Sequence, residues 1–169
     1  MRPKRISKDE YYLNIAKEVS RHSTCFRRAI GAIIIRDDQI ISTGYVGAPR
    51  KTKDSLEHGF CLRDKLNIPH GQRYELCRSV HAEQNAIINA ARAGVSLFGG
   101  DMYVYGSVYG ADKPINAFPC FICKKMIINS GLNRVICSRE KEKLKIFLVS
   151  DWVNDWQKND IIDDKQQYG

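Results

Sequence analysis

Two segments decide how this chain folds: residues 81–94, HAEQNAIINAARAG, and residues 119–131, PCFICKKMIINSG. Each predicts a helix that opens on a potential metal ligand and ends at a glycine, Gly94 in the first and Gly131 in the second. The positive end of a helix dipole favours thiolate over thiol at such a position. We therefore expect two helices whose N-termini carry metal ligands.

The first segment supplies His81 and the second supplies Cys120 and Cys123, and this set of side chains suits a zinc ion. Four protein ligands close a structural zinc site, whereas three leave a coordination position for water. Glu83 follows the histidine by two residues and is placed to act on that water as a general acid and base.

Each half of this pattern also has a plainer interpretation. The triplet His-Ala-Glu arises often by chance, and Cys-x-x-Cys is also typical of a redox pair or of half a zinc knuckle. A redox pair belongs on the first helix of a βαβ unit, whereas Cys120 and Cys123 come late in the chain, after a strand, a long loop and a proline. The two halves together favour the open zinc site.

The composition suits one α/β domain that spans residues 1–169. No apolar run is long enough to cross a membrane, and the basic N-terminus lacks the apolar stretch of a signal peptide. Six cysteines without such a signal indicate reduced thiols and a cytoplasmic location. A net charge of +8 fits nucleic acid, a single phosphate group or a solvated surface. A solvated surface is the first of these interpretations, and a single nucleotide phosphate is favoured over nucleic acid as a ligand; no membrane partner is expected.

Periodicity predicts a mixed sheet with helices on its faces. Ser7 is expected to cap a first helix that runs to about Arg21. Residues 143–149 fit either a helix or a last strand, and the polar residues 49–79 form an inserted, loop-rich segment. The predicted strands are residues 29–35, 40–44, 102–105 and 134–137, with a hairpin turn at 37–39.

From about Ser23 to Cys137 the chain resembles the deoxycytidylate (dCMP) deaminase family of the zinc-dependent cytidine deaminase superfamily. The resemblance implies a cytidine deaminase-like three-layer α/β/α fold with a central mixed sheet, and hydrolysis of dCMP to dUMP and ammonia for dTMP supply. It also implies a homo-oligomer. The likeness is carried by Ser-Thr-Cys at 23–25, IGAII at 30–34, IISTGY at 40–45, HAEQNAI at 81–87 and PCFICKK at 119–125.

The site residues have expected roles in this reaction. His81, Cys120 and Cys123 would hold the catalytic Zn²⁺, and Glu83 would move the protons. The Ala82 backbone is expected to contact the base, Tyr45 or Phe118 to pack on its ring, and Arg50 to bind the phosphate. Core packing is the alternative for the two aromatic residues, and a solvated basic loop is the alternative for Arg50.

Two features leave alternatives open. Val46 stands where the family has an asparagine that contacts the substrate sugar, so either sugar recognition or the substrate differs, and regulation by dCTP and dTTP is open as well. Another substrate (a free base, a nucleoside or nucleic acid carrying cytosine or adenine) is the second hypothesis, and a non-catalytic zinc-binding module is the third. Cys25, Cys61 and Cys77 either hold a second, structural zinc or are buried apolar side chains.

Overall fold

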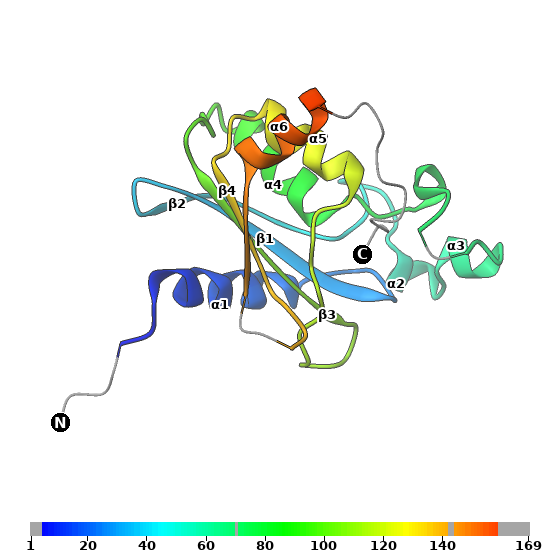
Figure 1. The fold of residues 1–169 in the computed structure, drawn as a ribbon. Helices are drawn as coiled ribbons and strands as arrows, with labels where there is room; N and C mark the ends of the chain where they lie inside the picture. Colours follow the sequence, from blue (N-terminus) through cyan, green and yellow to red (C-terminus); the bar gives the residue numbers. More distant parts are fainter. Residues whose placement is uncertain (1–4, 70, 142–143, 159–169) are drawn as a thin grey trace.

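The computed structural model describes residues 5–69, 71–141 and 144–158, which form a five-stranded sheet between two layers of helices (Figure 1). The strand order is β2-β1-β3-β4-β5. β3 and β4 pair in parallel and the other neighbours pair antiparallel, so the sheet is mixed, as predicted. The strands are β1 (Arg28–Arg36), β2 (Gln39–Tyr45), β3 (Asp101–Val108), β4 (Arg134–Cys137) and β5 (Lys145–Leu148).

Helices cover both faces of the sheet (Figure 1). Helix α1 (Lys8–Ser20) packs on β1 and β3 from one side, and α4 (Ala82–Arg92) packs on β2 and β1 from the other. Helices α5 (Phe121–Asn129) and α6 (Val149–Lys158) lie on the same face as α4. The expected three-layer α/β/α arrangement is therefore confirmed.

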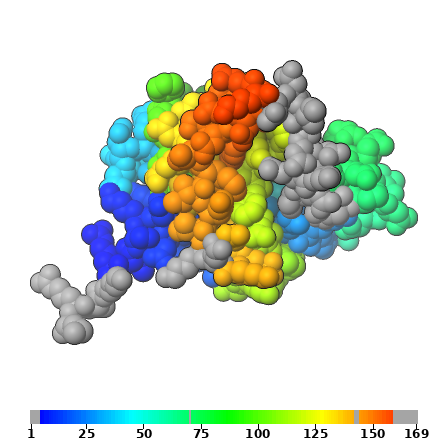
Figure 2. All heavy atoms as spheres, in the orientation of Figure 1, coloured from blue at the N-terminus to red at the C-terminus, as the bar shows by residue number. Residues whose placement is uncertain are grey.

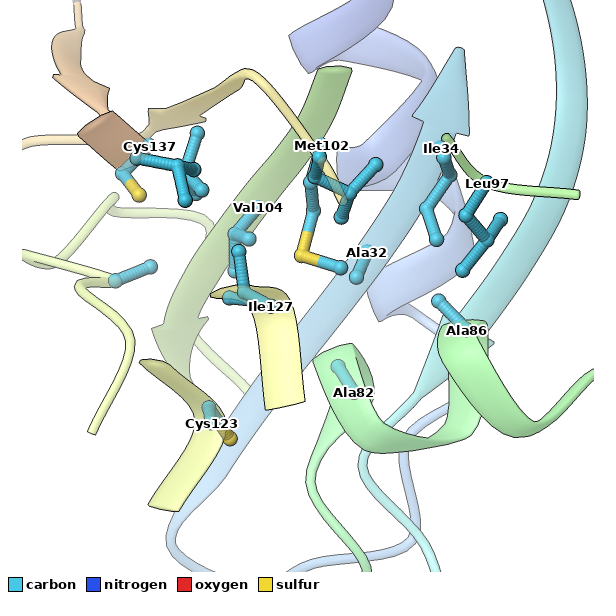
Figure 3. Packing of buried hydrophobic residues seen from close by; sticks show 14 of the residues in the cluster. Ala32, Ile34, Ala82, Ala86, Leu97, Met102, Val104, Cys123, Ile127 and Cys137 are labelled. Carbon is cyan, nitrogen blue, oxygen red and sulfur yellow. The ribbon is translucent and has the colours of Figure 1, made fainter. Parts of the chain in front are cut away.

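The alternation of side chains along the strands divides the core between the two faces. Met102 and Val104 of β3 face α4 and α5 and are fully buried, as is Ile127 of α5 (Figure 3). Tyr103, between them, faces α1 and packs with the buried Leu13. Burial of these apolar side chains is the main force that holds the helices to the sheet.

Local signals in the sequence form the predicted helix start and hairpin. The Ser7 side chain accepts a hydrogen bond from the Glu10 backbone, and the Glu10 side chain accepts one from the Ser7 backbone. Asp37 and Asp38 have positive φ angles of 51° and 63°, the conformation that a two-residue hairpin between β1 and β2 requires.

The structure resolves the ambiguous residues in favour of a strand, and it adds a helix that the sequence did not predict. β5 covers Lys145–Leu148, and α6 follows directly. α6 buries Val149 and Trp152 on the sheet, and its charged residues lie among them in the sequence. No helix in the described part of the chain is long and apolar enough to cross a membrane.

The inserted segment carries structure of its own, as expected for a loop of this length. It contains the short helices α2 (Ser55–His58) and α3 (Leu62–Lys65) and the 3₁₀ turn η1 (Tyr74–Leu76). It projects at one edge of the molecule, at the right of the view, where it is coloured green (Figure 2).

Candidate active site

The N-termini of α4 and α5 bring three potential metal ligands together. His81 is the N-cap residue of α4, Cys120 is the N-cap residue of α5, and Cys123 lies in the first turn of α5. His81 Nδ1 lies 3.4 Å from Cys120 Sγ and 3.3 Å from Cys123 Sγ. Within residues 5–69, 71–141 and 144–158, this is the one group of three or more His, Cys, Asp or Glu residues whose ligand atoms lie within 4.8 Å of one another.

The geometry of this group fits a zinc ion. Zinc–sulfur bonds of about 2.3 Å and zinc–nitrogen bonds of about 2.0–2.1 Å, in a tetrahedron, separate the sulfur and nitrogen atoms by about 3.6 Å. The observed separations of 3.3 and 3.4 Å are close to this value. Two sulfurs and one imidazole nitrogen leave one position of the tetrahedron open, as the sequence predicted.

The two cysteines differ in their protonation. The hydrogen bond with Cys123, and then that with His81, lower the pKa of Cys120 to about 4. The same bond and burial raise the pKa of Cys123 well above its usual value, so Cys123 retains the proton in the metal-free protein. Burial acts to lower the pKa of His81, but the hydrogen bond to Cys120 and the charge of Glu83 outweigh it and raise this pKa. Zinc binding must therefore displace a proton from Cys123.

Glu83 is buried in the first turn of α4, with 5% of its surface exposed. It lines the same pocket as His81 and Cys120 but is outside the group of ligand atoms. Burial raises the pKa of its carboxyl above the usual range. A carboxyl with raised proton affinity next to an open metal site is suited to transfer protons near neutral pH.

Close packing and hydrogen bonds fix α4 on β2, which sets the position of the histidine. A Cβ atom at Gly44 would lie 2.3 Å from the Ala86 nitrogen, so only glycine permits this approach. Ser42 Oγ donates to the Ala86 carbonyl at 2.6 Å, and Asn85 Nδ2 donates to the Tyr45 carbonyl at 2.8 Å. In the sequence, Asn85 was notable only as part of the family resemblance. In the structure, its hydrogen bond helps to position α4 on β2.

The pocket beside the three ligands has a volume of about 100 Å³. Ala82 and Phe118 line it, and Phe118 also packs edge-on against Phe147, with the ring centres 5.2 Å apart. Their contacts with a substrate base stay predictions. Val46 lines it too and is 6% exposed, so this part of the wall is apolar. Small-molecule sites usually measure about 300–1,000 Å³. The cavity is therefore smaller than a typical small-molecule site.

Two expected substrate contacts lie outside the wall of this pocket. The Tyr45 ring packs edge-on against His22, with the ring centres 4.8 Å apart. Arg50 is exposed, and its Nη2 donates to Asn89 Oδ1 at 2.6 Å. Their roles in substrate binding stay predictions. The sequence did not single out Arg63 and Tyr74, which do line the pocket.

Cys25, Cys61 and Cys77 line the pocket as half-buried free thiols. Among the residues that the structure describes, they do not form a group with ligand atoms within 4.8 Å of one another. A second zinc at these cysteines stays a prediction.

Comparison with known proteins places this site in a family. Residues 6–139 match the model of the cytidine and deoxycytidylate deaminase zinc-binding region. The chain belongs to this family. The His81, Cys120 and Cys123 group falls within the matched residues and fits zinc, the metal of the family.

Similar proteins agree with this assignment. The chain is 31% identical to a deoxycytidylate deaminase of Mycobacterium phage D29, over 78% of this chain and 94% of the relative. It is 30% identical to a deoxycytidylate deaminase of Schizosaccharomyces pombe, over 78% of this chain but only 37% of the yeast protein's length. The crystal structure of dCMP deaminase from the cyanophage S-TIM5 in apo form is similar, with a TM-score of 0.57, 25% identity and coverage of 85% of this chain and 89% of that one.

Proposed function

We propose that this protein is a zinc-dependent hydrolase that converts dCMP to dUMP and ammonia and thereby supplies the precursor of dTMP. The observation that carries this proposal is the burial of the Glu83 carboxyl beside His81 and Cys120 in one pocket. In a structural zinc site, a buried carboxyl beside the ligands has no role. A hydrolytic zinc site needs such a group to carry protons.

The nucleotide substrate is supported by the relatives and by the charge of the pocket. The relative from Mycobacterium phage D29 is named deoxycytidylate deaminase and is matched over 94% of its length. Arg27, Arg28 and Arg63 line the pocket, and Glu83 is the one carboxylate among its described lining residues. This charge balance favours an anionic substrate.

The residues of the pocket divide the proposed reaction between them. Zinc, when bound, is a Lewis acid that lowers the pKa of a water molecule toward ~7. The Glu83 carboxylate accepts a proton from this water and delivers it to N3 of the cytosine ring. The water oxygen bonds to C4, and Glu83 takes its remaining proton as this oxygen becomes the C4 carbonyl. Glu83 delivers that proton to the amino nitrogen, so the C4–N bond breaks and ammonia leaves. Phe118 and Val46 form an apolar wall for the ring, and the Ala82 backbone lies beside it.

Val46 favours one alternative within the same chemistry. An asparagine at this position would offer a hydrogen bond to a substrate sugar, whereas the buried valine offers none. A free base, a nucleoside or a cytosine or adenine in nucleic acid is therefore the second candidate substrate.

An ammonia-release assay tests the proposal directly. The zinc-loaded protein is assayed with cytosine, cytidine, deoxycytidine, CMP, dCMP, dCTP and a short single-stranded oligonucleotide. We expect the highest kcat/KM with dCMP. Equal or faster turnover of a base or nucleoside would overturn the nucleotide assignment. No ammonia from any of them at full zinc occupancy would favour a non-catalytic zinc-binding module.

The expected assembly and location also stay proposals. We propose a homo-oligomer on the basis of the family resemblance, and light scattering of the purified zinc-loaded protein measures its mass. A cytoplasmic location is proposed from the six cysteines, all of which are free thiols in this structure.

A further inference from the structure

Arg63 is a buried cation without a carboxylate partner. It lies on α3 in the inserted segment, and only 5% of its surface is exposed. Its Nη2 donates to the Pro69 carbonyl at 3.2 Å, but its buried Nε has no hydrogen-bond partner. Across the described residues, no carboxylate lies within 4.0 Å of its guanidinium. Burying an unpaired charge is costly, so a stable fold keeps one only where something compensates for it.

The adjacent carboxylate serves a different arginine. Asp64 follows Arg63 in the chain, but it pairs with Arg27, whose Nε donates to Asp64 Oδ1 at 2.9 Å. Arg27 and Arg63 both line the pocket. Asp64 therefore makes its ion pair with Arg27, and Arg63 has no ion pair of its own among the described residues.

Aromatic contacts hold the Arg63 guanidinium in place beside the metal ligands. Its central carbon lies 4.6 Å from the centre of the Tyr74 ring. The Tyr74 ring in turn contacts His81 edge-on, with the ring centres 5.5 Å apart. Stacking on an aromatic face orients the planar fork of donors, which suits the oxygens of a phosphate.

We propose that Arg63 binds the phosphate of the substrate and thereby makes the enzyme selective for nucleotides over nucleosides. This inference rests on the proposed function, and it gives the phosphate a different partner from the exposed Arg50. A nucleotide bound with its base at the metal ligands and its phosphate at Arg63 would compensate the buried charge. The selectivity would then come from the inserted segment at the edge of the molecule (Figure 2).

Kinetics of matched variants test the proposal. Arg63→Gln is compared with Arg73→Gln, which changes an exposed arginine of the same segment that pairs with Glu75. The substrates are dCMP and deoxycytidine, which differ in the phosphate alone. We expect Arg63→Gln to lower kcat/KM for dCMP by roughly 10- to 100-fold, the loss of one or two charge-assisted hydrogen bonds. The loss should fall mainly on KM, deoxycytidine should be nearly unaffected, and Arg73→Gln should behave as wild type.

Two kinetic results would overturn the assignment. Equal losses for dCMP and deoxycytidine in Arg63→Gln would remove the phosphate from the explanation. A selective loss for dCMP in Arg50→Gln, with none in Arg63→Gln, would return the phosphate to the exposed loop.

Binding of inorganic phosphate tests Arg63 independently of turnover. Phosphate should raise the Tm of zinc-loaded wild type and Arg73→Gln but not of Arg63→Gln. Without phosphate, Arg63→Gln should be at least as stable as wild type, because the substitution removes an unpaired buried charge. If Arg63→Gln is much less stable than wild type, the guanidinium is structural and the proposal is overturned. The proposal is also overturned if phosphate does not change the Tm of wild type. A phosphate effect that depends on Arg63 in a protein that does not turn over dCMP would refute the proposed function alone.

Discussion

Gly44 lies outside the pocket, but Gly44→Ala should displace the zinc-binding His81. The added Cβ would be 2.3 Å from the Ala86 nitrogen and 2.4 Å from the Ala82 carbonyl oxygen, whereas ordinary contact begins at 3.4 Å. α4 must therefore move away from β2 by about 1 Å, and His81 and Glu83 move with it. A metal site tolerates deviations of only about 0.2 Å in its metal–ligand distances. A 1 Å misplacement of reacting groups can lower a reaction rate by about 10²-fold.

Gly31→Ala is the matched control for this experiment. Its Cβ would lie 2.4 Å from the Ala16 carbonyl oxygen of α1, on the opposite face of the sheet. Both variants should lose stability, by roughly 1–3 kcal/mol for such overpacking. Only Gly44→Ala should also bind zinc more weakly in chelator competition and lose about 10²-fold in ammonia release. Equal zinc affinity in the two variants would refute the idea that Gly44 sets the position of α4 over the sheet.

Three other measurements examine the pocket itself. Glu83→Gln should keep its zinc and lose roughly 10²–10⁴-fold in turnover. Glu75→Gln, which changes an exposed carboxylate, should keep normal turnover. Near-normal turnover of Glu83→Gln would contradict the proton-transfer role. Because the pKa of Cys123 is raised, its thiol is protonated at neutral pH, so zinc affinity should fall as pH falls, by about tenfold per unit for each proton displaced. A pH-independent affinity in chelator competition would argue against this proton. Val46→Asn buries an amide in the apolar wall and should lower the unfolding free energy by about 1–3 kcal/mol. Bound dUMP should recover part of this loss if it forms a hydrogen bond with the amide. Unchanged stability would show that the amide reaches water.

Features encoded by neighbouring residues were predictable from the sequence. The Ser7 cap, the turn at Asp37 and Asp38, and the helix ends at Gly94 and Gly131 each depend on a few consecutive residues, and the structure shows positive φ at all four turn and end positions. The three metal ligands were predictable for a related reason, because their chemistry limits which residue types can serve.

Features that depend on distant contacts were not predictable. Arg63 is one of many basic residues in the sequence, and its burial becomes evident only when α3 packs beside Tyr74. The Tyr45 ring packs on His22, and no local pattern in the sequence determines this contact. α6 was missed because two buried side chains, Val149 and Trp152, hold an otherwise charged segment on the sheet.

The division of the ligands between α4 and α5 also has a consequence for biosynthesis. His81 and Glu83 come from a helix that packs on β1 and β2, which precede it in the chain, so this half can assemble early on the ribosome. The side chains of Cys120 and Cys123 emerge later and reach the site only after β3 has joined the sheet. A nascent chain that stops between the two helices offers a single ligand and cannot retain the ion. Zinc bound at His81, Cys120 and Cys123 in a purified sample therefore reports the fraction of molecules in which both halves have docked.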